Sequence, residues 1–524
     1  MKRTMVKRIT AIVLSAVLAL GVTSCGKGSG GNSGNNETAA DGKLFADGTN
    51  ISIIIGSHSS WPYHENWAVW KYFSEATGAT FDIQAIPNTD IDTKVNLIMA
   101  SPETLPDLLH VISKASIETH AMAGAFVSLS ANKDKMPSFV KFMDSLPEEQ
   151  GRELMLQRTS GDGEVYFAPV YGTETVQNLR TWMYRKDIFE KNNLKVPATL
   201  DELYDVSVQL KKLYPESYPL CFRNGLTQID VMSPIWKNDF SYLTYYDFKE
   251  NKWGFGASED TMKDVIVFFH KMSDAKLVPP DFLTIASKSW EELVSTDRGF
   301  IMPEYLVRLD YFNLPNRTKN PDYTWAIMEP PASGSALGGR KIAKLNMDPT
   351  GYLICNTGKQ DRIDNAFKLL DWMYSDEGSE LLAWGKEGET YKVVDGKKEF
   401  ILNADETAQS RYGINTYGVL QRTTPESYEA GYSKEQSEQA HVAYTYTEDH
   451  VNPSLWLAFN DEERAVFEEL YASIKDYTDE SLSHFILKTK PMSEWDNFQK
   501  GLKEMGLDRL MEVYESAYAR ATGK

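Results

Sequence analysis

Short apolar runs alternate with amphipathic stretches along residues 51–112, and this pattern constrains the fold more than any other feature of the chain. Ile51–Ile55 is a continuous apolar run between Asn50 and Gly56, which is typical of a buried strand. Similar reasoning predicts further strands over 80–86 and 108–112, and helices over 67–77 and 90–100. Strands that alternate with helices predict a mostly parallel sheet covered on both faces, and therefore an α/β fold.

A second unit of the same kind begins near Thr181–Tyr184, which reads as a short strand followed by a helix over 186–192. Thr199 and Glu202 form a capping box that opens a helix through Leu213. The C-terminal third is mostly helical, with apolar faces over 362–374, 462–474 and 494–518. Two α/β units in one chain predict a cleft between them, where small ligands commonly bind.

The charge balance excludes several classes of partner. The 524 residues are 42% hydrophobic and carry a formal net charge of -19, so the chain lacks the basic footprint that nucleic-acid binding needs. An acidic surface also disfavours adhesion to anionic lipid and a strongly anionic ligand, although a local basic pocket could override this average. The cysteines are Cys25, Cys221 and Cys355, and the last two are expected to be small buried residues.

The first 25 residues predict an export signal. Lys2, Arg3, Lys7 and Arg8 precede an apolar stretch that is too short to span a bilayer comfortably, so residues 1–24 are expected to be a signal peptide. Removing it takes away four basic residues and brings the charge to -23. Val22–Cys25 resembles a bacterial lipobox, which implies a lipid on Cys25 and a place at the outer face of the cell membrane. An ordinary signal peptide is the alternative. Residues 25–48 are rich in Gly, Ser and Asn and are expected to be a flexible tether.

Motifs for catalysis or metal binding are incomplete. Ser273 and Lys276 have the spacing of a serine–lysine pair, but the companion elements of that enzyme class are missing. Asn88, Asp90 and Asp92 begin like a calcium loop, whose twelfth position is then Met99. No phosphate-binding loop is present. We therefore expect no catalytic residues, no cofactor and no metal.

Several segments carry a resemblance to a known family. They are Trp182–Asp187, Leu194–Glu202, Phe367–Gly378, Gly385–Tyr391, Phe485–Phe498 and Met505–Tyr514. Together they resemble the family 1 extracellular solute-binding proteins of ABC importers, and the last two resemble the LipO-like lipoprotein branch. The resemblance implies a two-lobe periplasmic-binding-protein-like fold (type II, Venus-flytrap) with crossover hinges. It also implies capture of an oligosaccharide and delivery to ABC permease subunits.

On this basis we expect lobe 1 over residues 49–176 and 345–412, and lobe 2 over residues 177–344 and 413–524. Some members of the family hold calcium in an insert after the helix that begins at Thr199. Here that helix runs directly into Lys211–Pro219 without such an insert, so no calcium site is expected. The protein is expected to be a monomer.

Sugars present apolar C–H faces and hydroxyl groups, so a sugar site needs flat aromatic rings beside polar side chains. Loops at the edges of the lobes can expose such residues. The stronger candidates for ligand contact are His58, Trp61, Tyr63, Tyr171 and Asn178, together with Trp290, Glu387 and Tyr391, which the family resemblance implies. The weaker candidates are Arg223, Trp236, Asp348 and Trp384.

Three functions remain open at this point. The first is a transport binding protein without chemistry. The second is a surface glycoside hydrolase or lyase that uses the same cleft aromatics with a pair of carboxylates. The third is a sensory or scaffold lipoprotein that has lost ligand binding. The resemblance favours the first.

Overall fold

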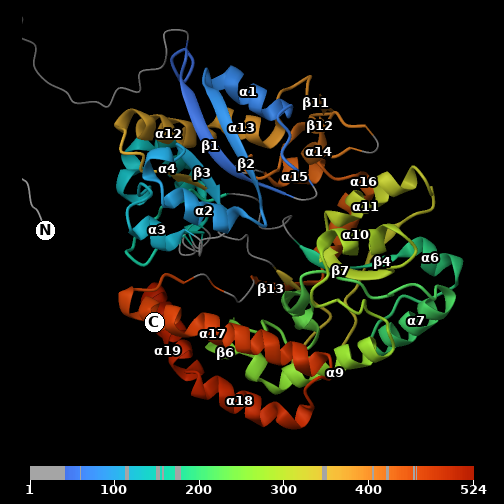
Figure 1. The fold of residues 1–524 in the computed structure, drawn as a ribbon. Helices are drawn as coiled ribbons and strands as arrows, with labels where there is room; N and C mark the ends of the chain where they lie inside the picture. The colour runs from blue at the N-terminus through green and yellow to red at the C-terminus, as the bar shows by residue number, and fades with distance from the viewer. Residues whose placement is uncertain are drawn as a thin grey trace, which may run out of the picture.

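The chain folds into two α/β lobes that are both assembled from separate stretches of sequence (Figure 1). The computed structural model describes residues 42–58, 61–111, 117–148, 151, 154–155, 158–170, 179–344, 351–403, 406–419, 424–451, 455 and 457–523. Lobe 1 contains the N-terminal part, and lobe 2 contains the C-terminal helices. In Figure 1 the blue N-terminal strands lie in the upper lobe and the red C-terminal helices lie in the lower lobe.

Lobe 1 is built on a four-stranded sheet in the order β10-β3-β1-β2. The strands β1 (Asn50–Ser57), β2 (Thr80–Pro87) and β3 (Leu108–Val111) are parallel, and β10 (Gly351–Ile354) is antiparallel to β3. Neighbouring residues of β1 point to opposite faces, so Ile53 and Ile55 enter one hydrophobic cluster and Ile54 enters another. The sheet is therefore covered on both faces, as the sequence predicts.

Helices from both ends of the chain cover this sheet. The helices α1 (Ala68–Thr77), α4 (Pro137–Ser145), α12 (Gln360–Met373) and α13 (Asp376–Trp384) pack on one face, and α2 (Ile91–Met99) packs on the other. Gly78 ends α1 in the left-handed conformation (φ 82°), which a residue without a Cβ adopts at little cost. The predicted strand–helix–strand order of residues 51–111 is confirmed.

Lobe 2 has a different sheet. The strand β4 (Arg180–Arg185) lies between β7 (Ile301–Tyr305) and β8 (Trp325–Met328), and it is antiparallel to both. The expectation of a parallel sheet in this unit is therefore wrong for these strands. Thr199 caps α7 (Leu200–Leu213), and its hydroxyl accepts a hydrogen bond from the Glu202 amide at 3.1 Å, which is one half of the predicted capping box. The Glu202 carboxylate accepts from the Ala198 amide at 2.7 Å instead of from the Thr199 amide.

The remaining elements surround these sheets. The other strands are β5 (Thr244–Asp247), β6 (Lys252–Phe255), β9 (Ile342–Lys344), β11 (Tyr391–Val394), β12 (Lys397–Phe400) and β13 (Thr447–Val451). The other helices are α3 (Glu118–Met122), α6 (Lys186–Lys191), α8 (Gln228–Met232), α9 (Asp260–Asp274), α10 (Ser287–Ser295), α11 (Arg308–Arg317), α14 (Ala408–Tyr412), α15 (Pro425–Ala430), α16 (Lys434–Tyr444), α17 (Asp461–Ile486), α18 (Trp495–Glu504) and α19 (Leu507–Thr522). Within the described residues, no helix is both long enough and apolar enough to cross a membrane.

The structure corrects three predicted boundaries. Phe45 is only 3% exposed and packs in the core of lobe 1, so the tether does not extend to residue 48. Residues 413–419 also pack on lobe 1, because Val419 enters its core and Gly418 lies against Ile55. The predicted start of the last lobe 2 segment at residue 413 is therefore too early. Finally, the helix predicted over 494–518 is divided into α18 and α19 at Gly506, whose φ is 94°.

Several predictions fall outside the described residues. They include the signal peptide, Cys25 and all of the predicted tether up to residue 41. The segments 171–178 and 345–350, where the first two crossings between the lobes are expected, are also outside.

Candidate ligand site at the junction of the lobes

His58 and Trp61 lie at the carboxyl end of the first strand of lobe 1. His58 directly follows β1, and its ring stacks on the Trp61 ring with the two centroids 4.9 Å apart. Tyr417 packs beside His58, with their centroids 5.9 Å apart. The carboxyl ends of parallel strands share one edge of a sheet, where ligands of α/β proteins commonly bind. Both residues therefore follow β1 at this edge, and their contact with a ligand stays a prediction.

Lobe 2 meets this pair through the first turn of α11. Arg308 and Tyr311 are three residues apart on one helix face. The Tyr311 ring packs edge-on against Trp61 with centroids 5.8 Å apart. The Arg308 guanidinium lies 5.8 Å from the centre of the Trp61 ring and 4.6 Å from that of Tyr311. The two lobes are thus joined by aromatic rings, which can stack on apolar faces, and by a guanidinium group, which can donate hydrogen bonds.

A buried ion pair lies behind this contact. Glu304 on β7 accepts hydrogen bonds from Arg223, with Nε to Oε2 at 2.6 Å and Nη2 to Oε1 at 3.2 Å. The next residue, Tyr305, pairs in register with Arg180 on β4. The Arg180 guanidinium stacks 4.3 Å from the centre of the Tyr305 ring and donates a 2.7 Å hydrogen bond to its hydroxyl.

The electrostatic setting of the junction is shaped by these arginines. Burial lowers the pKa of His58 to about 4, and the positive charges of Arg308 and Arg223 add to this effect. His58 is therefore neutral near pH 7, with one nitrogen that donates and one that accepts. Burial alone would raise the pKa of Glu304, but the neighbouring arginines outweigh burial and hold it below its usual value. Glu304 is therefore a carboxylate.

The lobes also touch at a second place. Arg464 in the first turn of α17 pairs with Glu118 of α3, with Nη2 to Oε1 at 3.1 Å. The same carboxylate oxygen accepts a 3.1 Å hydrogen bond from the Gly161 amide. A Cβ on Gly161 would lie 2.1 Å from the Phe459 carbonyl oxygen, so the close approach of the lobes requires glycine here.

Four of the predicted ligand residues are core residues instead. Trp290 lies in α10 with 0% of its surface exposed, so the prediction that it sits on a cleft loop is wrong. Trp236 is 2% exposed and packs on Phe268. Tyr391 and Trp384 pack against each other within a small cluster of lobe 1, and both are buried. Rings packed in this way cannot also stack on a sugar, so these four assignments are corrected.

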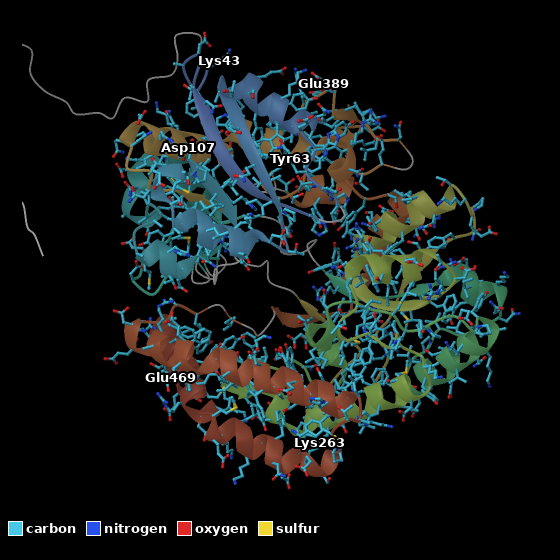
Figure 2. The ribbon with its side chains drawn as sticks, viewed as in Figure 1. Lys43, Tyr63, Asp107, Lys263, Glu389 and Glu469 are labelled. Atoms are coloured by element: carbon cyan, nitrogen blue, oxygen red, sulfur yellow. The ribbon has the colours of Figure 1, made fainter. Side chains whose placement is uncertain are left out.

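The other candidates have different positions. Tyr63 lies within lobe 1 (Figure 2), and its ring packs edge-on against Trp67. Glu387 is exposed, and contact with ligand stays a prediction for it. Arg223 lies in the charged group described above. The remaining three, Tyr171, Asn178 and Asp348, are outside the described residues.

The sequence analysis missed most of the lobe 2 side of this junction. The missed residues are Arg180, Glu304, Tyr305, Arg308 and Tyr311, with Tyr417 on the lobe 1 side. Tyr305-Leu-Val-Arg308-Leu-Asp-Tyr311 does carry a signal, because it alternates aromatic and basic residues directly after an apolar run.

In the part of the chain that the structure describes, no group of three or more His, Cys, Asp and Glu side chains is arranged to hold a metal ion. What the junction offers is aromatic faces, guanidinium donors and a neutral imidazole. These groups suit binding of a polar ligand with apolar faces.

The chain has relatives of known function. The family model described as bacterial extracellular solute-binding protein matches residues 65–380. Lipoprotein LipO of Bacillus subtilis (strain 168) is 27% identical over 239 residues, which cover 43% of this chain and 44% of LipO, less than half its length. The fructooligosaccharide ABC transporter substrate-binding protein FusA of Streptococcus pneumoniae serotype 4 is 21% identical over 553 aligned residues, covering 97% of each chain.

Solved structures share the fold. The alginate-binding protein AlgQ2, solved without calcium ion, superposes with a TM-score of 0.73 at 20% identity, covering 91% of this chain and 99% of that one. The predicted two-lobe periplasmic-binding-protein-like fold is thereby confirmed. With the match over residues 65–380, the chain belongs to the family of bacterial extracellular solute-binding proteins.

Proposed function

We propose that this protein captures an oligosaccharide between its two lobes and delivers it to the permease of an ABC importer. One observation carries the proposal: His58 and Trp61 of lobe 1 meet Arg308 and Tyr311 of lobe 2 at a single junction. Aromatic rings stack on the C–H faces of sugars, and guanidinium groups donate strong hydrogen bonds to their oxygens. A ligand held here would contact both lobes.

Contact with both lobes gives a mechanism for transport. Two lobes connected by crossing segments exchange between open and closed arrangements, and a ligand that touches both favours the closed one. The permease then distinguishes loaded from empty protein by shape. The pair between Arg464 and Glu118 would form on the same closure, since it also joins the lobes.

The names of relatives agree with this function. FusA is named as a fructooligosaccharide-binding protein of an ABC transporter, and AlgQ2 as an alginate-binding protein. LipO is named as a lipoprotein, which supports a lipid on Cys25 and a position at the outer face of the cell membrane. We further propose that the protein acts as a monomer.

A binding role fits the junction better than the alternative of a glycoside hydrolase or lyase. Glycoside hydrolysis generally needs two carboxyl groups, one of which stays protonated to serve as an acid. Glu304 and Glu291, the carboxyl groups beside the arginines of the junction, are ion-paired with Arg223 and Arg308, and the pKa of Glu304 is lowered rather than raised. Such a group is suited to holding an arginine in place.

The test is a panel of oligosaccharides, screened by thermal shift and then titrated by calorimetry. We expect Trp61→Ala to weaken binding by about 1–3 kcal/mol, on the scale of base–aromatic stacking, while the melting temperature changes little. Tyr204→Ala is the matched control, because Tyr204 is a partly buried ring on α7 that packs with Lys271 of lobe 2. Affinity unchanged by Trp61→Ala would refute this site. Mass spectrometry of the incubated sugars checks the alternative, since cleaved products would mean an enzyme.

A further inference from the structure

Guanidinium groups and aromatic rings alternate from β4 of lobe 2 to Trp61 of lobe 1. Arg180 and Arg223 lie 4.3 and 6.0 Å from the centre of the Tyr305 ring. Arg223 and Arg308 then lie 5.3 and 5.5 Å from the centre of the Trp290 ring, and Arg308 reaches Trp61. We call this series, formed by Arg180, Tyr305, Arg223, Trp290, Arg308 and Trp61, the arginine ladder.

Two of the three arginines in the ladder have carboxylate partners. Arg223 is paired with Glu304, and Arg308 Nη1 lies 3.2 Å from Glu291 Oε1. Arg180 differs: within the described residues, no carboxylate oxygen lies within 4.0 Å of its guanidinium. Its Nη2 donates to the Tyr305 hydroxyl, while its Nε is buried without an acceptor in the described part of the chain.

Asp230 and Glu304 both interact with Arg180 over a longer distance. Glu304 is already ion-paired with Arg223, and Asp230 does not neutralise Arg180 fully. Burial raises the pKa of Asp230 to about 7, against the opposing effects of hydrogen bonds and of Arg180. Its Oδ1 already accepts a 2.9 Å hydrogen bond from the Tyr242 amide. Near pH 7 the carboxyl group is therefore only partly ionised and already has a backbone partner.

The ladder is thus a local excess of positive charge in a chain whose formal net charge is -19. Its three guanidinium groups face two paired carboxylates, Glu304 and Glu291, and the adjacent His58 is neutral because its pKa is lowered to about 4. An average acidic surface disfavours an anionic ligand, but a local basic site can override the average. The ladder reaches the junction of the lobes at Arg308, which contacts Trp61 of the other lobe, and Arg180 lies at its far end on β4.

We propose that the ligand is an acidic oligosaccharide, and that Arg180 receives the carboxylate of a uronic acid residue while Trp61 contacts a sugar face. This inference rests on the proposed function and narrows it. A planar guanidinium matches a carboxylate through two parallel N–H donors, which neutral hydroxyl groups do not reproduce. The single excess charge suits a carboxylate, whereas a phosphate monoester carries between one and two negative charges near pH 7.

The test uses pairs of ligands that differ only in charge. Oligogalacturonates of defined length, their full methyl esters, sulfated oligosaccharides and neutral fructo-oligosaccharides are titrated into the purified protein by calorimetry. The variants are Arg180→Gln, which removes the charge, and Arg180→Lys, which keeps the charge but not the planar fork. Arg509→Gln is the control: Arg509 is an exposed arginine paired with Glu469, which lies on the opposite side of lobe 2 from β4 (Figures 1 and 2).

We expect the acid to bind at least tenfold more tightly than its methyl ester. Arg180→Gln should weaken binding of the acid about 10- to 100-fold, since it removes a hydrogen bond to a charged group, and should leave the ester nearly unaffected. The affinity of Arg180→Lys for the acid should lie between those of Arg180→Gln and the unmodified protein. Arg509→Gln should bind the acid as tightly as the unmodified protein. Melting curves of each variant check that it is folded, and Arg180→Lys still decides the matter where Arg180→Gln does not fold.

Three outcomes overturn the inference. If the ester or the neutral sugars bind as tightly as the acid, oligosaccharide capture stands and the acidic ligand is rejected. If the sulfated sugars bind most tightly, the carboxylate is rejected. If no member of the panel binds, the result contradicts oligosaccharide capture as well.

Discussion

Replacing Trp290 by alanine should destabilise lobe 2 without acting directly on ligand. The side chain has no exposed surface and packs edge-on against Phe312, with ring centroids 5.5 Å apart. It also lies beneath two guanidinium groups, those of Arg223 and Arg308. Its truncation would leave a cavity at the centre of the cluster that supports the arginine ladder.

The expected loss of stability is large. Truncation of a buried tryptophan to alanine costs about 3–5 kcal/mol, because the transfer term and the cavity term add. Each cation–π contact that is lost adds roughly 1 kcal/mol, although the energies of the two contacts and of the cavity are not additive. Domains are stable by only about 5–15 kcal/mol, so the variant should fold but melt roughly 5–10 °C lower.

The assay is thermal and urea unfolding of Trp290→Ala beside Trp290→Phe. Phenylalanine keeps a ring beneath the guanidinium groups, so it should lose less stability than alanine. Any loss of affinity in Trp290→Ala should be partly restored in Trp290→Phe, since its origin is displacement of Arg223 and Arg308. If Trp290→Ala instead left the melting temperature unchanged and abolished binding, Trp290 would face the ligand and its assignment to the core would be refuted.

The other predictions concern closure, pH and anchoring. Arg464→Leu should weaken the contact between the lobes by about 2 kcal/mol, because it removes the ion pair between Arg464 and Glu118. Small-angle scattering should then show a larger radius of gyration for the ligand-free protein. Burial lowers the pKa of His110 to about 3, so the folded state binds fewer protons than the unfolded state below the ordinary pKa of about 6.5. Above that pH, His110 does not lower the free energy of unfolding. As the pH falls from roughly 7.5 to 5, His110 lowers this free energy by about 2 kcal/mol. The lowered pKa of His58 makes stability fall with pH in the same direction. In urea unfolding, the free energy of unfolding of His110→Leu should therefore depend less steeply on pH. Equal slopes for the variant and the unmodified protein would contradict this prediction. Cys25→Ala should release the protein from cells or leave it unprocessed, and a mature N-terminus at another residue, found by mass spectrometry, would exclude the lipid anchor.

The elements of lobe 1 could be predicted from sequence because their signals are local. The apolar run of β1 and the glycine after α1 are each contained within a few neighbouring residues. The sequence places Phe45 in the tether because the surrounding segment is rich in Gly, Ser and Asn, although Phe45 packs in the core. Its burial comes from the approach of α1, since the Phe45 amide donates to the Thr77 carbonyl oxygen at 2.9 Å, and no local window contains that contact.

The error at Trp290 has a different cause. The family resemblance implies an aromatic residue at the cleft at this position, but Trp290, Leu293 and Val294 have the i, i+3, i+4 spacing of a buried helix face. That spacing was the available signal. The division at Gly506 could likewise have been read from glycine at the end of a helix.

The lobe 2 side of the site could not be predicted by such reasoning. Arg180 and Tyr305 are 125 positions apart and meet only because β4 pairs antiparallel with β7. Trp61 and Arg308 meet only because the two lobes touch. Contacts of this kind depend on topology and on the relative position of the lobes, and neither is encoded in a short window of sequence.

The most direct test of oligosaccharide capture is a crystal structure of the protein with the tightest-binding oligosaccharide of the panel. The account predicts a sugar ring in van der Waals contact with Trp61, with its oxygens within hydrogen-bond distance of lobe 2 residues that include Arg180 or Arg308. A sugar bound to one lobe alone, or away from the junction, would contradict it.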